Sequence, residues 1–218
     1  MGLGGVAKRI AAQLAPRTFI MRGATGPEHR IGLTFDDGPH PENTPRILDV
    51  LDAHGVRATF FVQGDMVERH PTLLREVAAR GHRVGNHGYG HMDARDTAWT
   101  EYLASVLRTQ ALLEEIVGSP LPRYFRPPYG SITLRSTIAL VRHGYQFVFW
   151  SLDSRDSFVP DASALLAHVE GQRMEPGCIM LLHEDYHHTV VALEPLIALV
   201  RRRGLVPVAI DSLLLRQP

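Results

Sequence analysis

Residues 44–62 read TPRILDVLDAHGVRATFFV, and this stretch contains the unit from which most of the chain is built. Thr44-Pro45 is a typical helix start, with an N-cap side chain followed by proline in the first turn. Gly55 can adopt the left-handed conformation that ends many helices. The apolar run at 58–62 lacks strict alternation, as in a strand that is buried on both faces. The stretch therefore predicts a helix, a glycine cap and a buried strand.

The same order recurs along the chain and predicts the fold. Glycines separate a helix-like stretch from a strand-like stretch six times, at Gly55, Gly81, Gly118, Gly144, Gly171 and Gly204. The predicted strands are 30–35, 58–62, 82–85, 123–125, 145–150, 178–182 and 205–209. Further helices are expected at 71–80, 97–117, 132–143, 162–170 and 190–203, the last four capped by Asp96, Ser131, Asp161 and Thr189.

Strands that alternate with helices indicate parallel β/α winding with right-handed crossovers. We therefore predict an α/β fold in a single domain, a distorted (β/α)7-type barrel. Periodicity leaves an open doubly wound sheet as the alternative.

The bulk composition is that of an ordinary globular protein. The 218 residues carry 23 basic and 23 acidic side chains, so the formal net charge of zero gives no reason to expect a nucleic-acid partner. The single cysteine, Cys178, cannot form an internal disulfide, and no segment reaches the roughly 18–20 apolar residues of a transmembrane helix. Twelve histidines are many for this length and fit a site that uses imidazole as ligand and proton carrier.

Residues 1–29 are predicted to form a helical extension before the barrel, which spans 30–218. Val6, Ile10 and Leu14 lie at helical spacing and favour a helix packed on the bottom of the barrel. A membrane-surface helix, with peripheral membrane contact, and a degenerate export signal are the alternatives. The apolar stretch is too short and too polar for a signal-peptide core, which favours a cytoplasmic location. The sequence does not predict the oligomeric state.

Candidate functional residues cluster directly after the predicted strands, where the active sites of (β/α) barrels assemble. Asp36 and Asp37 follow the first strand, and Gly38-Pro39 then turns the chain. Such a turn can aim two adjacent carboxylates at one centre, so that one ligates a cation while the other accepts a proton. Simple turn chemistry is the alternative.

A pair of histidines follows a second strand. His87 and His91 stand at i and i+4, which places two imidazoles side by side on one helical turn. A surface or capping role is commoner for an isolated pair. With a carboxylate from another strand, however, two histidines form a catalytic ligand set that leaves positions open for water and substrate.

A rigid segment, RPPYG at 126–130, follows a third strand. Its prolines limit the backbone, so the segment can hold Arg126 and the backbone N–H of Tyr129 in fixed places. Arg126 could pin a carboxylate through a bidentate pair, and a surface ion pair is the alternative.

His183 follows the apolar strand at 178–182 and is expected to point into the mouth of the barrel. An acid such as Asp156 would hold its orientation and raise its pKa. A structural histidine is the alternative. His187 and His188 are expected to lie solvated in the following loop.

Taken together, the segments around Asp36, His87, Arg126, Asp156 and His183, five motifs in that order, resemble the polysaccharide deacetylases of carbohydrate esterase family four, the nodulation-factor deacetylase homology domain. The match runs from about Ile31 to Leu213 in the family's motif order, and the motifs at 34–39, 126–130 and 181–183 are intact. The resemblance implies a metal-dependent hydrolase that removes N-acetyl groups from an amino-sugar oligo- or polysaccharide and releases acetate. It implies zinc as the ion, with cobalt or nickel as alternatives, and an exported location as the alternative to the cytoplasm.

The resemblance also implies a role for each matching residue. The metal ligands would be Asp37, His87 and His91. The catalytic residues would be Asp36 as base, Arg126 as the group that holds the base, Tyr129 as oxyanion donor through its N–H, His183 as general acid, and Asp156 as the partner of that acid, with Asp153 as the alternative.

Two positions depart from the family pattern. The residue after the first metal histidine is usually serine or threonine, whose hydroxyl braces the ligand loop, whereas this chain has Gly88, and we expect weaker metal binding. The fourth motif often ends in tryptophan, whereas this chain has Ser157, and we expect a wider sugar groove. O-acetyl ester hydrolysis, opening of a cyclic amide and a non-catalytic glycan-binding barrel are the alternative functions.

Overall fold

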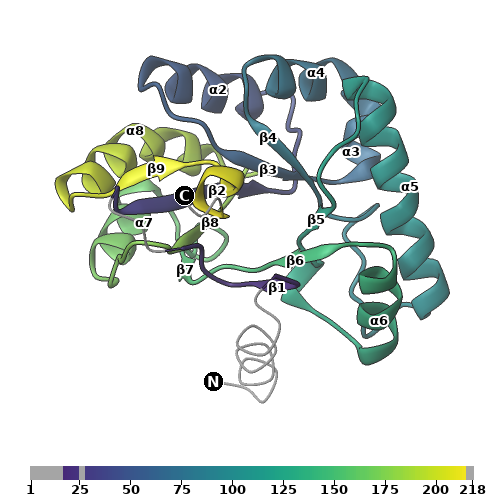
Figure 1. Ribbon diagram of the computed structural model, residues 1–218. Helices are drawn as coiled ribbons and strands as arrows, with labels where there is room; N and C mark the ends of the chain where they lie inside the picture. Colours follow the sequence, from purple (N-terminus) through teal and green to yellow (C-terminus); the bar gives the residue numbers. More distant parts are fainter. Residues whose placement is uncertain (1–16, 25–27, 215–218) are drawn as a thin grey trace.

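The computed structural model describes residues 17–24 and 28–214, which form one curled parallel sheet covered by helices (Figure 1). This confirms the predicted single-domain α/β barrel and excludes the open doubly wound sheet. The helix predicted around Val6, Ile10 and Leu14 lies outside the described residues. Within the extension predicted at 1–29, Phe19–Ile20 form a strand instead of a helix.

The described sheet has nine strands, and every pair in it is parallel. They are β1 (Phe19–Ile20), β2 (Arg30–Asp36), β3 (Thr59–Val62), β4 (Arg83–Asn86), β5 (Tyr124–Phe125), β6 (Gln146–Val148), β7 (Leu152–Asp153), β8 (Ile179–His183) and β9 (Val206–Val208). Their order is β1-β6-β5-β4-β3-β2-β8-β7, with β9 also paired to β2. All seven predicted strands form, and the structure adds β1 and β7.

Residues 146–153 connect the two ends of the sheet and explain why the barrel is distorted. β6 pairs with β5, whereas β7, which begins after three intervening residues, pairs with β8. The strand predicted at 145–150 is therefore part of a longer segment that changes partners. Where the chain passes from one partner to the other, Arg126 Nε donates to the Val148 carbonyl at 3.1 Å and Nη2 to the Phe149 carbonyl at 3.4 Å. Beyond the end of β5, a side chain thus provides hydrogen bonds to this segment, while β1 pairs with it through Ile20 opposite Val148.

Helices cover the outside of the sheet (Figure 1). They are α2 (Asn43–Ala53), α3 (Gly64–Arg69), α4 (Pro71–Ala79), α5 (Trp99–Val117), α6 (Leu134–Arg142), α7 (Ala162–Glu170), α8 (His187–Arg202) and α9 (Ile210–Leu214), with a 3-10 turn, η1, at Pro128–Gly130. Five of the six predicted cap glycines have positive φ, whereas Gly171 has φ −72° and the prediction was wrong there.

Of the five predicted N-caps, only Asp161 is confirmed, since its carboxylate accepts from the Ala164 N–H at 2.9 Å. Thr44 lies inside α2, which begins at Asn43, so the prediction was wrong there. α6 is capped by Thr133 instead of Ser131, and α5 begins after Ala98. α8 begins at His187, so Thr189 lies inside its first turn, and its hydroxyl bonds to another site described below. His187 is exposed, as predicted, but His188 is half-buried and both belong to the helix.

α9 closes one end of the barrel. Ile210 and Leu213 pack with Phe61, Val148 and Ile179 in one apolar cluster. The Ile210 N–H donates to the Thr59 hydroxyl at the start of β3, which places α9 at the N-terminal ends of the strands. A pocket inside the barrel must therefore open at the opposite end, where the strands finish.

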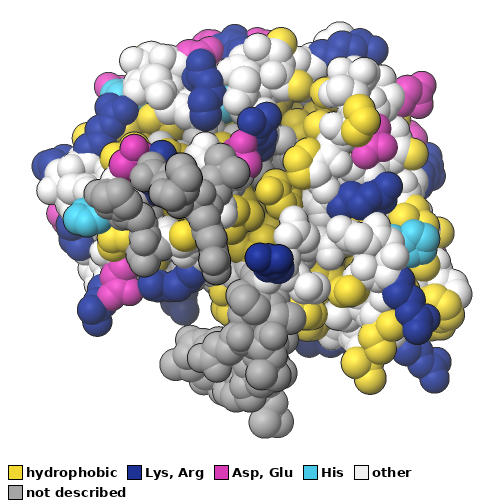
Figure 2. All heavy atoms as spheres, viewed as in Figure 1, with side chains coloured by type: hydrophobic (Ala, Val, Ile, Leu, Met, Phe, Trp, Pro, Cys, Tyr) yellow, Lys and Arg dark blue, Asp and Glu magenta, His cyan; other side chains and the backbone are white. Residues whose placement is uncertain are grey.

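The surface in Figure 2 mixes acidic and basic side chains without a large field of one sign, consistent with the net charge of zero. Within the described residues, no helix is both long and apolar enough to cross a membrane.

Candidate active site

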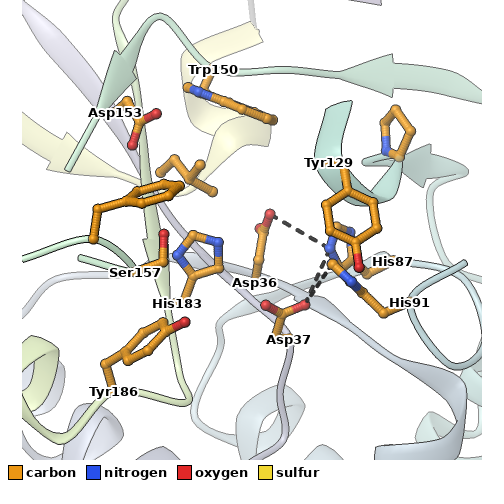
Figure 3. A pocket seen from close by; sticks show the side chains of 13 residues that line it. Asp36, Asp37, His87, His91, Tyr129, Trp150, Asp153, Ser157, His183 and Tyr186 are labelled. Carbon is orange, nitrogen blue, oxygen red and sulfur yellow. Dashed lines mark ion pairs between the residues drawn. The ribbon is translucent and has the colours of Figure 1, made fainter. Parts of the chain in front are cut away.

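A cavity of about 490 Å³ opens at the C-terminal ends of the strands. Figure 3 shows side chains from β2, β7, β8 and the loops after β4 and β5 converging on it. The residues that line it are Asp36, Asp37, His87, His91, Pro127, Tyr129, Trp150, Asp153, Ser157, Phe158, Leu181, His183 and Tyr186.

The three residues predicted as metal ligands meet on one side of this cavity. Asp37 Oδ1 lies 3.3 Å from Nε2 of His87 and 3.3 Å from Nε2 of His91 (Figure 3). The three donor atoms all lie within 4.8 Å of one another. Two imidazole nitrogens and one carboxylate oxygen suit a divalent ion such as zinc, and three protein ligands leave room for further ones. The residues present therefore fit the ion that the motifs imply.

The two histidines converge through a loop and not through a helical turn, so that part of the prediction was wrong. Residues 87–92 contain no helix. Gly88 and Gly90 have φ of 77° and 73°, and His91 itself has φ of 52°. Glycine adopts such angles without a Cβ clash, so the two glycines fold the loop back and bring the second imidazole beside the first.

Two hydrogen bonds orient these donors. His87 Nδ1 lies 2.7 Å from the Arg126 carbonyl, which can only accept, so Nδ1 carries the proton and Nε2 faces the centre. Gln63 donates its amide to Asp37 Oδ1 at 2.7 Å. Sequence reasoning missed Gln63, although it follows β3 directly, in the position that the other site residues occupy after their strands.

Asp37 is a suitable anionic ligand. Burial would raise the pKa of its carboxyl group, but the hydrogen bond from His87 and the charges of the nearby histidines outweigh burial and hold the pKa below its usual range. A carboxylate that is ionised at neutral pH binds a cation more strongly than a protonated one.

Asp36 lies beside the ligand set without belonging to it. Arg126 Nη1 donates to Asp36 Oδ1 at 2.6 Å, and both side chains are almost completely buried. The same nitrogen donates to the Thr34 hydroxyl at 2.8 Å, and the guanidinium lies 4.2 Å from the centre of the Phe61 ring. Arg126 thus holds one carboxylate oxygen, while Oδ2 lies 3.9 Å from His87 Nε2.

The opposite side of the cavity contains a buried acid and a histidine. Asp156, not Asp153, is the partner of His183: its Oδ1 lies 2.7 Å from His183 Nδ1. Asp156 Oδ2 accepts from the His183 N–H at 2.7 Å and from the Thr189 hydroxyl at 3.0 Å. Asp153 lines the cavity, but its carboxylate accepts from the Arg155 N–H.

The environment of His183 favours its protonated form. Burial would lower the pKa of the imidazole, but the Asp156 carboxylate, with smaller contributions from Asp36 and Asp37, raises it to about 9. Because Nδ1 is bonded to Asp156, Nε2 is the nitrogen available to a ligand in the cavity.

Tyr129 follows two prolines and has φ of 56° and ψ of 9°. Its ring stands edge-on to His91, with centroids 4.4 Å apart, and is mostly exposed at the rim. The N–H of Tyr129 has no hydrogen-bond acceptor among the residues that the structure describes, while the next two N–H groups bond to Pro127 and Pro128. A free donor at this position can bind a ligand oxygen.

Comparison with known proteins points to one family. A family model described as polysaccharide deacetylase matches residues 23–148. A chitooligosaccharide deacetylase of Bradyrhizobium sp. is 38% identical over 186 residues, which are 79% of this chain and 84% of that protein. A solved peptidoglycan N-acetylglucosamine deacetylase, in complex with 4-naphthalen-1-yl-N-oxidanyl-benzamide, has a TM-score of 0.86 and 30% identity and covers 93% of this chain and 95% of its own.

The similar structures include a protein without catalytic function. A CE4 family pseudoenzyme of Bacillus anthracis has a TM-score of 0.82 and 28% identity, and the match covers 89% of this chain and 68% of that one. The fold alone therefore does not decide activity, and the residues in the cavity must carry that argument.

Proposed function

We propose, from the premise that this chain belongs to the polysaccharide deacetylase family, that it removes N-acetyl groups from an N-acetylglucosamine-containing oligo- or polysaccharide and releases acetate. One observation carries the proposal: a set of metal-binding donors, a carboxylate outside that set and a histidine bonded to a buried acid face a single cavity. Amide hydrolysis would use all three. A divalent ion polarises a carbonyl group, a carboxylate accepts the proton of the attacking water, and a histidine protonates the amine, which leaves only when protonated.

Asp37, His87 and His91 would hold the divalent ion, which we propose to be zinc, with cobalt or nickel as alternatives. When bound, the ion supplies Lewis-acid chemistry: it polarises a carbonyl group and makes water more acidic.

Asp36 accepts the proton of the attacking water. Arg126 and the buried position fix the carboxylate, so that Oδ2 is the oxygen free to take the proton. Because Arg126 is itself bound by Thr34 and by two backbone carbonyls, the base is held in one orientation before substrate arrives.

The Tyr129 N–H donates to the acetyl oxygen as negative charge develops on it. The two prolines before Tyr129 stiffen the segment, so the donor needs little reorganisation during the reaction. Loss of one such donor typically costs about 3 kcal/mol of transition-state stabilisation.

His183 protonates the departing amine from Nε2. At neutral pH the imidazole holds this proton, because its pKa is raised to about 9. The Asp156 carboxylate compensates the positive charge of the protonated ring and, through its bond to Nδ1, holds the ring in one orientation.

An acetate-release assay tests the proposal. The full chain, loaded with zinc, is incubated with chito-oligosaccharides and with O-acetylated sugars, each with and without a chelator. We expect acetate from the N-acetyl substrates, loss of release with chelator and recovery on adding zinc. Release that survives the chelator, or that comes from O-acetyl sugars alone, would contradict the proposal.

A further inference from the structure

The loop that carries both histidine ligands reads HGYGH at 87–91, and Tyr89 is the only side chain beyond glycine between them. Gly88 and Gly90 adopt positive φ and supply no side chain that could brace the loop. A loop with two such glycines has many accessible conformations when nothing holds it. The contacts that hold the segment between the two histidines must therefore come from Tyr89 and from the backbone.

Tyr89 is held by side chains from two helices. Its hydroxyl donates to Glu68 Oε2 of α3 at 2.8 Å and accepts from Arg108 Nη2 of α5 at 3.0 Å. The Arg108 guanidinium also lies over the Tyr89 ring, 3.9 Å from its centroid, and donates to Glu68 Oε1 at 2.7 Å. These three residues form a closed triangle of contacts, which we name the Tyr89 clamp.

The side of the ring toward α3 packs against the start of that helix. A Cβ on Gly64 would lie 2.5 Å from Tyr89 Cδ2, so this position leaves room for the ring only because it is glycine. The Gly64 N–H also donates to the Gly88 carbonyl at 2.9 Å, and the Gly88 N–H donates to Asn86 Oδ1 at 2.8 Å. Backbone and side chain thus fix the loop to the same helix.

We propose that Tyr89, through the clamp with Glu68 and Arg108, is a positioning residue that holds His87 and His91 in metal-binding geometry. The clamp takes over the bracing that a hydroxyl at position 88 would give. This inference rests on the metal site of the proposed function. A loop that is fixed before the ion arrives loses less conformational freedom on binding, so the clamp increases metal affinity.

The ion pair alone would not have this effect. The side chains of Arg108 and Glu68 are 57% and 41% exposed, and pairs as exposed as this contribute little by themselves. The effect therefore passes through the Tyr89 ring, which joins the pair to the ligand loop.

Zinc affinity tests the inference without recourse to activity. Metal-stripped full chain is titrated with zinc against a chromogenic chelator, and cobalt absorption spectra report the ligand geometry. Tyr89→Ala should raise the zinc Kd by about tenfold, the range typical of groups that orient metal ligands. Tyr89→Phe keeps the ring and its contact with Arg108, so we expect a loss of only about threefold.

A matched control uses a second exposed arginine in an ion pair. Arg57 pairs with Asp52 at 2.7 Å just before β3, at the opposite end of the sheet from the site. Arg108→Met should weaken zinc binding, whereas Arg57→Met should leave it unchanged. Should Tyr89→Ala fail to fold, Tyr89→Phe and Arg108→Met decide the question.

Wild-type zinc affinity and an unchanged cobalt spectrum in Tyr89→Ala would overturn the inference, as would equal losses in Arg108→Met and Arg57→Met. A drop in the Tm of the metal-free protein with no change in Kd would show a merely structural contact and would also overturn it. These outcomes leave the proposed function intact. Failure of the wild-type chain to bind zinc would instead overturn the proposed function together with the inference.

Discussion

The two sides of the cavity are built differently. On the acid side, Asp156 is fully buried, both of its oxygens have partners, and it fixes His183 completely. On the metal side, two imidazoles approach one oxygen of Asp37, and one of them lies on a loop that turns at two glycines. A single buried carboxylate therefore fixes the acid side, whereas the position of His91 on the metal side depends on how its loop is held.

The pKa of each histidine depends on its burial and on the charges beside it. Burial lowers the pKa of His91, so it is neutral and able to ligate at neutral pH. Burial also opposes protonation of His87, but the charges of Asp36 and Asp37 outweigh it and raise the pKa, so that ion and proton compete for this ring. In the proposed function, the same residue type would serve as ligand on one side and as acid on the other, because the surroundings differ.

The largest effect is expected at Asp36, which lies between the two sides. Asp36→Asn removes the base and should lower kcat/KM by about 10³-fold, within the range for general-base catalysis. Zinc binding should be retained, because Asp36 is not one of the three ligands, and the pKa of His183 should fall only slightly, because Asp36 contributes less to it than Asp156 does. Acetate-release kinetics, chelator competition and circular dichroism of the same sample check this. A variant that keeps more than about a tenth of the wild-type rate would contradict the role of Asp36.

Asp156→Asn should affect the acid side alone. In the folded protein the pKa of His183 is about 9, above its ordinary value near 6.5, so His183 favours the protonated form and activity falls as pH rises through about 9. Without the carboxylate, burial remains and lowers the pKa of His183, so the high-pH fall of the pH–rate profile (its falling limb) should move to lower pH. The kcat at pH 7.5 should drop by roughly 10²-fold.

The stability that Asp156 contributes through His183 is fully present below about pH 6.5 and is lost as pH rises through about 9. Asp153→Asn is the matched control, because Asp153 lines the cavity without bonding to His183. A falling limb that stays in place in Asp156→Asn, or that moves equally in Asp153→Asn, would contradict this assignment.

Gln63→Ala should give the opposite pattern. It removes the amide that bonds to Asp37 Oδ1, so zinc affinity should fall by about tenfold. The falling limb of the pH–rate profile, which reports His183, should stay in place. Zinc titration and a pH–rate profile at saturating zinc measure the two effects separately. If Gln63→Ala moved the pH limb, the two sides would not be independent.

The smallest effect is expected at Glu184, which is buried beneath the turn after β2. A Cβ on Gly38 would lie 1.7 Å from Glu184 Oε1, and Thr44 donates to Oε2. Burial, aided by nearby carboxylates, raises the pKa of Glu184 to about 8, so folding favours the protonated form and stability falls as pH rises from about 4.5 to about 8.

Glu184→Gln cannot ionise, so its Tm relative to wild type should be higher by a few degrees at pH 8.5 than at pH 5.5. Scanning calorimetry at the two pH values measures this difference. The same Tm difference at both values would show that Glu184 does not titrate in the folded chain.

The sequence predicted the parts of the molecule that repeat. The order of helix, glycine and strand placed all seven predicted strands, and the polar residues after them meet in one cavity. The missed features depend on contacts across the barrel. β7 forms because residues 146–153 change partners, and the role of Gln63, which follows β3 directly, becomes evident from its bond to Asp37. The fold of the histidine loop was also missed, since spacing of i and i+4 does not distinguish a helical turn from a turn at two glycines.

Arg126 joins the architecture of the barrel to its chemistry. The same guanidinium that bonds to Asp36 also bonds to the carbonyls of Val148 and Phe149, beyond the end of β5. A change that shifted residues 148–149 by a fraction of an ångström would therefore move Arg126 and reorient the carboxylate of Asp36. In this barrel, the segment that changes partners and the orientation of the Asp36 carboxylate are therefore coupled through one side chain.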